Sequence, residues 1–180
     1  MRRRLGIGVC ALGSLVAMLW GIGSLLPADH VAACRVRLAQ PRERIFAVIT
    51  DFASHPTWRE DVERVDVLDA TPDHQVMREH GDNGPLDVRV ERVDRPRALV
   101  TRVADPDGNF EATWTFELER IAGATQLVIT ERGTVHSALF RLLSRTVFST
   151  TATMEQYQQA LGRRFSENVF TSCEVLPAGQ

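Results

Sequence analysis

The pattern of hydrophobic and polar positions predicts a series of β-strands over most of the chain. The clearest strand covers residues 110–119, where every second residue is apolar, from Phe110 through Trp114 and Phe116 to Leu118. Weaker alternation predicts strands over residues 31–39, 61–69, 74–80, 86–91, 98–103 and 126–135. Most connections are short turns rich in Gly, Asp and Pro, which predicts an antiparallel sheet of about seven strands.

Helical spacing appears in two regions. Pro41 suits the first turn of a short helix that ends near Asp51, and residues 51–58 predict a second short helix or a compact loop. A long amphipathic helix is predicted over about residues 137–167, with a bend at the weak helix formers 149–153. Its inner stripe consists of Phe140, Leu143, Val147, Thr151, Met154, Gln158, Leu161 and Phe165. A sheet with one apolar face buries such a helix by curving around it, so the predicted fold class is α+β.

The N-terminus has a different pattern. Three arginines at positions 2–4 precede 22 residues, Leu5 to Leu26, that contain no charge. As a helix this segment rises about 33 Å, enough to cross a hydrocarbon core of about 30 Å. Residues 1–28 are therefore predicted to form a cytoplasmic arginine cluster and a single transmembrane anchor, with the domain on the periplasmic or extracellular side. Secretion after signal cleavage near Pro27, or lipid modification of Cys34, are the alternatives.

One face of the predicted anchor carries small residues. Gly13, Ala17 and Gly21 recur every four residues. This spacing allows two membrane helices to pack closely and predicts a homodimer contact. Glycine is also common in membrane helices generally, so the pattern has an interpretation without a dimer.

Composition and charge sharpen this division. The 180 residues have a formal charge of −2, but residues 29–180 hold all 23 acids and 18 of the 21 arginines, a formal charge of −5. An acidic domain with scattered arginines does not favour nucleic-acid binding. No cysteine or histidine spacing predicts a metal site, and no phosphate or dinucleotide motif predicts a cofactor. In an oxidising compartment, Cys34 and Cys173 could join the first strand to the C-terminal tail.

Several short motifs accompany this order of elements: Pro27-Ala28-Asp29-His30, Pro41-x-x-x-Ile45-Phe46, Thr50-Asp51-Phe52, Pro56-x-Trp58-Arg59, Thr130-Glu131-x-Gly133, Phe140-Arg141-x-Leu143 and Arg163-Arg164-Phe165. With the element order, they resemble the START-like helix-grip (SRPBCC) superfamily, in particular its polyketide cyclase/dehydrase and lipid-transport branch, over about residues 29–169. The resemblance implies a sheet and long helix that enclose an apolar cavity for lipids, hormones or polyketides. In some members it also implies cyclisation or dehydration chemistry.

Among the polar residues, Glu131 is the best-supported candidate for a catalytic or ligand-binding group. It shares the strand parity of Leu127, Ile129, Gly133 and Val135, so its carboxylate is expected to point inward with the apolar set. An inward carboxylate must find a partner or stay protonated, which suits a general acid/base or a hydroxyl-binding group. A buried ion pair with an arginine, or a bulge that turns the side chain outward, is the alternative.

The candidate ligand-binding residues are apolar side chains expected on the inner face and polar members of the helix stripe: Trp58, Phe110, Trp114, Phe116, Val147, Thr151, Met154 and Gln158. Each apolar residue could equally be an ordinary core residue. The two polar residues, Thr151 and Gln158, could mark where the inner stripe of the helix reaches solvent. Tyr157 lies about 100° off the stripe and receives no role. Arg59 is expected to pair with Asp61 or another surface acid.

The expected organisation is an anchor or signal segment at 1–28, a helix-grip domain at 29–170 and a tail at 171–180. The favoured hypothesis is a membrane-anchored domain that binds a hydrophobic or amphipathic, lipid-like molecule in an internal cavity. A polyketide cyclase/dehydrase-like enzyme that uses Glu131, and a structural or sensor module with a filled interior, are the alternatives.

Overall fold

The computed structural model describes residues 18–71, 74–82, 84–146 and 151–177. Residues 18–25 are helical. The elements that follow are β1 (Asp29–Leu38), α2 (Arg42–Thr50), the 3-10 helix η1 (Phe52–Thr57), β2 (Val62–Thr71), β3 (His74–Gly81), β4 (Leu86–Asp94), β5 (Ala98–Ala104), β6 (Phe110–Ile121), β7 (Ala124–Val135), α3 (Ala138–Thr146), α4 (Ala152–Arg164) and β8 (Thr171–Leu176).

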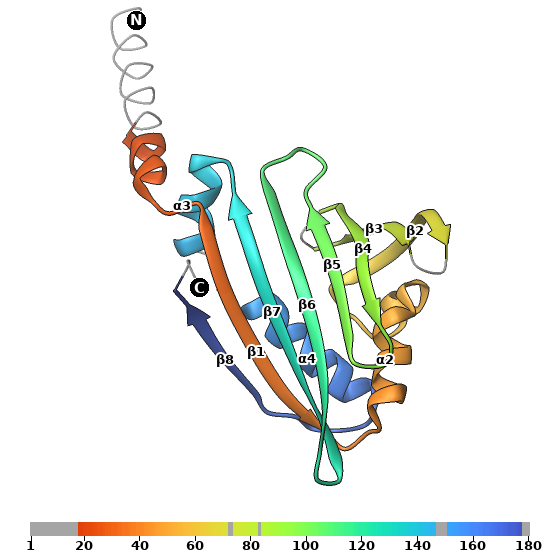
Figure 1. Cartoon of the computed structure of the whole chain (residues 1–180). Helices are drawn as coiled ribbons and strands as arrows, with labels where there is room; N and C mark the ends of the chain where they lie inside the picture. Colours follow the sequence, from red (N-terminus) through yellow and green to blue (C-terminus); the bar gives the residue numbers. More distant parts are fainter. Residues whose placement is uncertain (1–17, 72–73, 83, 147–150, 178–180) are drawn as a thin grey trace, which may run out of the picture.

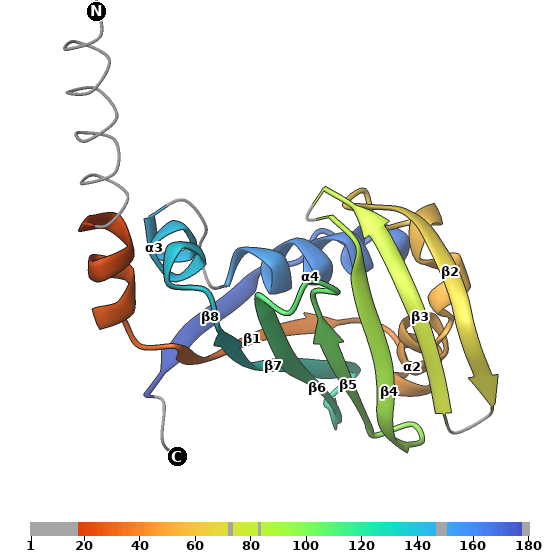
Figure 2. The same cartoon turned by 90° about the horizontal axis from the view of Figure 1, so that it is seen from above.

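All eight strands belong to one antiparallel sheet with the order β2-β3-β4-β5-β6-β7-β1-β8 (Figure 1). Strands β2 to β7 follow one another as hairpins. The first strand, β1, pairs with β7, at the opposite end of this series from β2. The sheet is strongly curved, and α4 crosses its concave side while α2 and η1 cover the end near β2 (Figure 2). The predicted α+β class and curved antiparallel sheet are therefore confirmed.

The C-terminal segment is not a free tail. Residues 171–176 form β8, which pairs antiparallel with β1 and places Cys34 directly opposite Cys173. The two cysteines form a disulfide across the pair. The prediction of about seven strands therefore missed an eighth, because β1 offered a free edge that only the folded sheet reveals.

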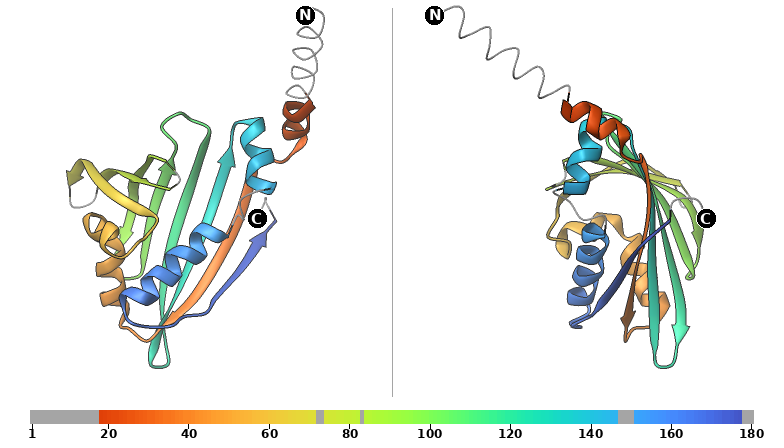
Figure 3. Two further views of the ribbon diagram at one scale, coloured as in Figure 1. Left: turned by 180° about the vertical axis from the view of Figure 1, so that it is seen from behind. Right: turned by 90° about the vertical axis from the view of Figure 1, so that its left-hand side faces the viewer.

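The predicted long helix is divided in two. Helical residues end at Thr146 and resume at Ala152, and residues 147–150 lie outside the described part of the chain. Helix α3 sits beside the end of β7, whereas α4 lies across the sheet (Figure 3). One stripe consequently does not continue through both helices: Met154, Gln158 and Leu161 are buried, but Phe140 is almost half exposed.

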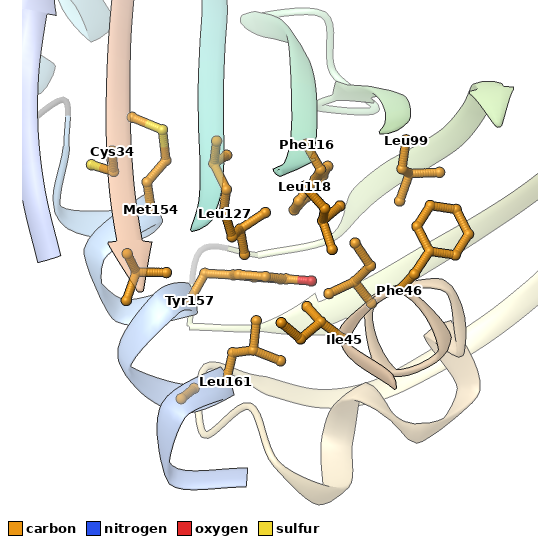
Figure 4. Packing of buried hydrophobic residues seen from close by; sticks show 14 of the residues in the cluster. Cys34, Ile45, Phe46, Leu99, Phe116, Leu118, Leu127, Met154, Tyr157 and Leu161 are labelled. Atoms are coloured by element: carbon orange, nitrogen blue, oxygen red, sulfur yellow. The ribbon is translucent and has the colours of Figure 1, made fainter. Parts of the chain in front are cut away.

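The core lies between α4, α2 and the concave face of the sheet. Met154, Tyr157 and Leu161 of α4 pack against sheet residues such as Leu127 and Phe116 (Figure 4). Ile45, Phe46 and Ile49 close the core from α2. This arrangement buries a broad face of α4 rather than a narrow stripe, which is the condition for a helix held inside a curved sheet.

The N-terminal segment is described from residue 18 onward. Within the described residues, no helix has both the length and the apolar character needed to cross a membrane. Most of the predicted span 5–26, including Gly13 and Ala17, lies outside the described residues. The anchor and its homodimer contact therefore stay predictions.

Candidate functional site

A large cavity opens between the sheet and the helices. Its volume is about 1210 Å³, above the range of about 300–1000 Å³ that is usual for small-molecule sites. Apolar side chains form most of the wall: Phe52, Val62, Leu86, Val88, Val103, Phe110, Trp114, Phe116, Val135, Phe140 and Tyr157. The polar part of the wall includes two separate groups of titratable residues. The interior is thus not filled by the core.

The structure divides the predicted site residues into two sets. Phe110, Trp114, Phe116 and Glu131 line the cavity. Trp58, Met154 and Gln158 are buried in the core, and Thr151, the N-cap residue of α4, is not among the lining residues. Val147 lies outside the described residues, so its prediction stays untested. Gln158 Nε2 donates to the carbonyl of Cys34 at 2.8 Å, so the stripe does not reach solvent at this position.

Glu131 points into the cavity and is paired with His30. With its hydrogen on Nε2, the His30 imidazole donates to Glu131 Oε1 at 2.7 Å, and the Glu131 side chain is only 9% exposed. This tautomer leaves Nδ1 as an acceptor. The partner is therefore a histidine on β1, not the arginine considered from the sequence.

Gly133 makes the position of the His30 ring possible. His30 and Gly133 are paired across β1 and β7, two residues from Glu131. A Cβ atom at position 133 would collide with the imidazole ring. The motif Thr130-Glu131-x-Gly133 thus combines the acid with the open space that its partner ring occupies.

A second polar group lies where η1 meets β3. His55 Nδ1 donates to Glu79 Oε1 at 2.9 Å, and Arg59 Nη1 donates to both Glu79 oxygens at 2.9 Å. The opposite edge of the Arg59 guanidinium donates to Asp61, with Nη2 at 2.6 Å. All four side chains are at most 10% exposed, and all four line the cavity. Arg59 does pair with Asp61 as expected, but the pair is buried instead of superficial.

Electrostatics favour the charged forms within this second group. Burial alone would raise the pKa of Glu79, but the hydrogen bond from His55 and the charge of Arg59 outweigh it and hold that pKa below its ordinary value. Burial opposes the charge of Arg59, yet Glu79 and Asp61 raise its pKa. The ion pairs can therefore persist in the cavity wall through mild acid.

Tyr157 is the centre of an aromatic cluster that the sequence did not predict. Its ring centroid lies 5.4 Å from that of Trp58, 5.5 Å from Phe116 and 6.0 Å from Trp114. The Arg59 guanidinium stands over the same ring, 5.2 Å from the centroid. Burial raises the pKa of Tyr157 above its usual range, so its hydroxyl stays protonated. Tyr157 therefore contacts both the aromatic side chains of the cavity wall and the arginine of the buried ion pairs.

The disulfide lies beside an acidic side chain. One oxygen of Glu155 and the two sulfurs of Cys34 and Cys173 fall within 4.8 Å of one another. Because the sulfurs are bonded to each other, they offer no thiolate ligands to a metal ion.

Fold and site together define a helix-grip domain with an internal cavity. The family model for polyketide cyclase/dehydrase and lipid-transport proteins matches residues 32–165, and the chain belongs to this family. A search of curated proteins finds no match.

Solved structures share the fold at low identity. The Zhui aromatase/cyclase from Streptomyces sp. R1128 is 17% identical with a TM-score of 0.59, and the match covers 76% of this chain and 96% of that one. A START superfamily protein from Mycobacterium smegmatis has the same identity and TM-score, with 76% and 97% covered. Norcoclaurine synthase from Thalictrum flavum is 11% identical with a TM-score of 0.62, over 77% and 87%. At these identities the likeness concerns the fold alone.

Proposed function

We propose that the domain binds a hydrophobic or amphipathic, lipid-like molecule in its internal cavity. The observation that carries this proposal is a cavity of about 1210 Å³ with an aromatic wall in a domain of this family. Burial of the apolar body of the ligand against Trp114 and Phe116 would supply most of the affinity. The His30–Glu131 pair and the group around Glu79 would orient polar atoms of the ligand.

We also propose that residues 5–26 anchor the domain to a membrane, with the domain on the periplasmic or extracellular side. The uncharged segment and the arginines at positions 2–4 support this topology. The disulfide between Cys34 and Cys173 favours an oxidising compartment. Secretion after signal cleavage would place the same domain in the same compartment without the anchor.

One observation favours an enzyme as the second candidate function. His30 and Glu131 form a hydrogen-bonded imidazole–carboxylate pair in the cavity wall, an arrangement that can accept and return a proton. In a cyclase/dehydrase-like reaction His30 would transfer the proton and Glu131 would hold its ring. Glu131→Gln should then abolish turnover of a bound polyketone while ligand binding persists. Loss of binding without any turnover in the parent protein would exclude this candidate.

Native mass spectrometry of the full chain in detergent tests the binding proposal. The unmodified protein should carry a copurifying ligand as a mass adduct. Val103→Trp, which places a large ring in the cavity wall, should remove the adduct, and Leu86→Trp should do the same from a second wall position. Val67→Trp, at an exposed position outside the wall, is the matched control. An adduct that survives both wall variants, or no adduct on folded parent protein, would overturn the proposal.

A further inference from the structure

The N-terminal helix and α3 are held together at one end of the sheet. Gly23 is buried against the backbone of Ala138, so closely that a Cβ atom at position 23 would collide with it. The Arg141 guanidinium donates to the carbonyl of Val135 at 2.8 Å and to that of Leu26 at 3.3 Å. Figures 1 and 3 show the two helices side by side above the ends of β7 and β1. Their relative position is therefore set by packing and by hydrogen bonds.

Both helices expose large apolar side chains to solvent. Leu139 and Phe140 of α3 are each nearly half exposed, although the burial of apolar surface is the main drive for folding. On the N-terminal helix the exposed apolar residues are Met18, Trp20, Ile22 and Leu25. Large exposed apolar side chains on two helices that touch at Gly23 and Ala138 mark a candidate interaction surface.

The uncharged segment places this surface at a membrane. If Leu5–Leu26 spans the bilayer, as proposed above, Gly23 lies three residues, or about 5 Å, inside the end of the span. Ala138, the first residue of α3, contacts Gly23, which places this end of α3 at the same depth, near the interface between headgroups and acyl chains. Amphipathic helices bind in that layer with their apolar face buried about 5–10 Å.

The same surface borders the cavity. Phe140 and Arg141 of α3 line the cavity wall, as do Pro27 and Ala28, which follow the N-terminal helix. We propose that α3 lies in the membrane interface with Leu139 and Phe140 in contact with lipid, so that the cavity exchanges its ligand directly with the bilayer. This inference rests on the proposed anchor and assigns the lipid bilayer as the source or destination of the ligand.

Photo-crosslinking of the full chain tests the placement of α3. The chain is reconstituted into vesicles of three parts phosphatidylcholine to one part phosphatidylglycerol, with p-benzoylphenylalanine replacing Leu139 or Phe140. Leu68, exposed to a similar degree on β2, is the matched control. Illumination should give lipid adducts at positions 139 and 140 in at least tenfold higher yield than at position 68. Equal yields at the three positions would overturn the inference.

Two further outcomes separate this inference from the proposals beneath it. Full chain that leaves the vesicles in a carbonate wash would overturn the anchor and, with it, the placement of α3. If the chain stays in the vesicles and carries a ligand in detergent, but gives no adducts above the level of Leu68, the anchor and the cavity stand and the docking of α3 fails. The Trp20 position, replaced in the same way, reports whether the photoreactive group can reach lipid at all.

Discussion

Glu79→Gln should destabilise the domain strongly although the substitution preserves size. Arg59 Nη1 donates to both Glu79 oxygens at 2.9 Å, and His55 donates to one of them. Both side chains of the Arg59–Glu79 pair are only 10% exposed, so solvent compensates little for the lost carboxylate charge. Breaking a buried ion pair costs about 3–5 kcal/mol. Because glutamine keeps one acceptor for Arg59, we expect a loss of about 3 kcal/mol.

Thermal unfolding of the full chain in mild detergent measures this loss. For a chain of this size, about 3 kcal/mol corresponds to a fall of roughly 6–12 °C in Tm. Glu111→Gln is the matched control, since Glu111 pairs with Arg102 on the surface, and it should shift Tm far less. If the two variants lowered Tm equally, the buried network would not stabilise the fold and the reasoning would be refuted.

The pH dependence of Glu79→Gln gives a second test. The pKa of Glu79 is lower in the folded state than its ordinary value of 4.5, so its stabilisation is fully present above the unfolded pKa. It is lost as the pH falls through the folded-state pKa. The difference in Tm between parent and variant should stay constant from about pH 8 to about pH 5.5 and narrow in stronger acid. If the difference in Tm between parent and variant instead grew in acid, the prediction that the pKa of Glu79 is lowered by folding would be wrong.

Three other substitutions probe the remaining features. Gly133→Ala should lower the free energy of unfolding by about 1–3 kcal/mol, because the new methyl group overpacks against the His30 ring. In a His30→Ala background the same substitution should cost much less, so equal costs in the two backgrounds would contradict the predicted collision. Cys173→Ser should lower the free energy of unfolding by about 2–5 kcal/mol and make the denaturant midpoint insensitive to reductant, unlike that of the parent. Met154→Ala should cost about 2–5 kcal/mol in denaturant unfolding, whereas a loss below about 1 kcal/mol would mean that Met154 does not belong to the core.

The local part of the fold could be read from the sequence. Period-two alternation predicted seven strands, and parity along β7 predicted that Glu131 points inward; both are confirmed. These predictions depend only on neighbours within one strand. The sequence left open whether Cys34 and Cys173 pair, and the register of β1 and β8, which places them opposite each other in a disulfide, settles it.

Contacts between distant segments could not be read in this way. His30 and Glu131 are 101 residues apart, and only the register of β1 against β7 brings them together. The buried group of His55, Arg59 and Glu79 joins η1 to β3, a pairing that no periodicity encodes. The run of Pro56, Trp58 and Arg59 and the expected pairing of Arg59 with Asp61 were the signals near this group.

Tyr157 shows a second limit of periodicity. A narrow stripe through Met154, Gln158 and Leu161 leaves Tyr157 to one side, which is why it received no role. A helix inside a curved sheet is covered from several directions, so residues at the margin of the stripe are buried as well. The same coverage from several directions explains why Met154, expected at the cavity, belongs to the core.

The disulfide has a topological consequence. Cys34 lies five residues into β1, and Cys173 lies in the last strand, so the bond closes a covalent ring that contains almost the whole domain. A single break of the backbone anywhere between these two cysteines leaves both fragments joined. After such a break the N-terminal helix would remain covalently attached to β8 and to every residue that follows it. A break inside the ring must therefore be combined with reduction before the two fragments can separate.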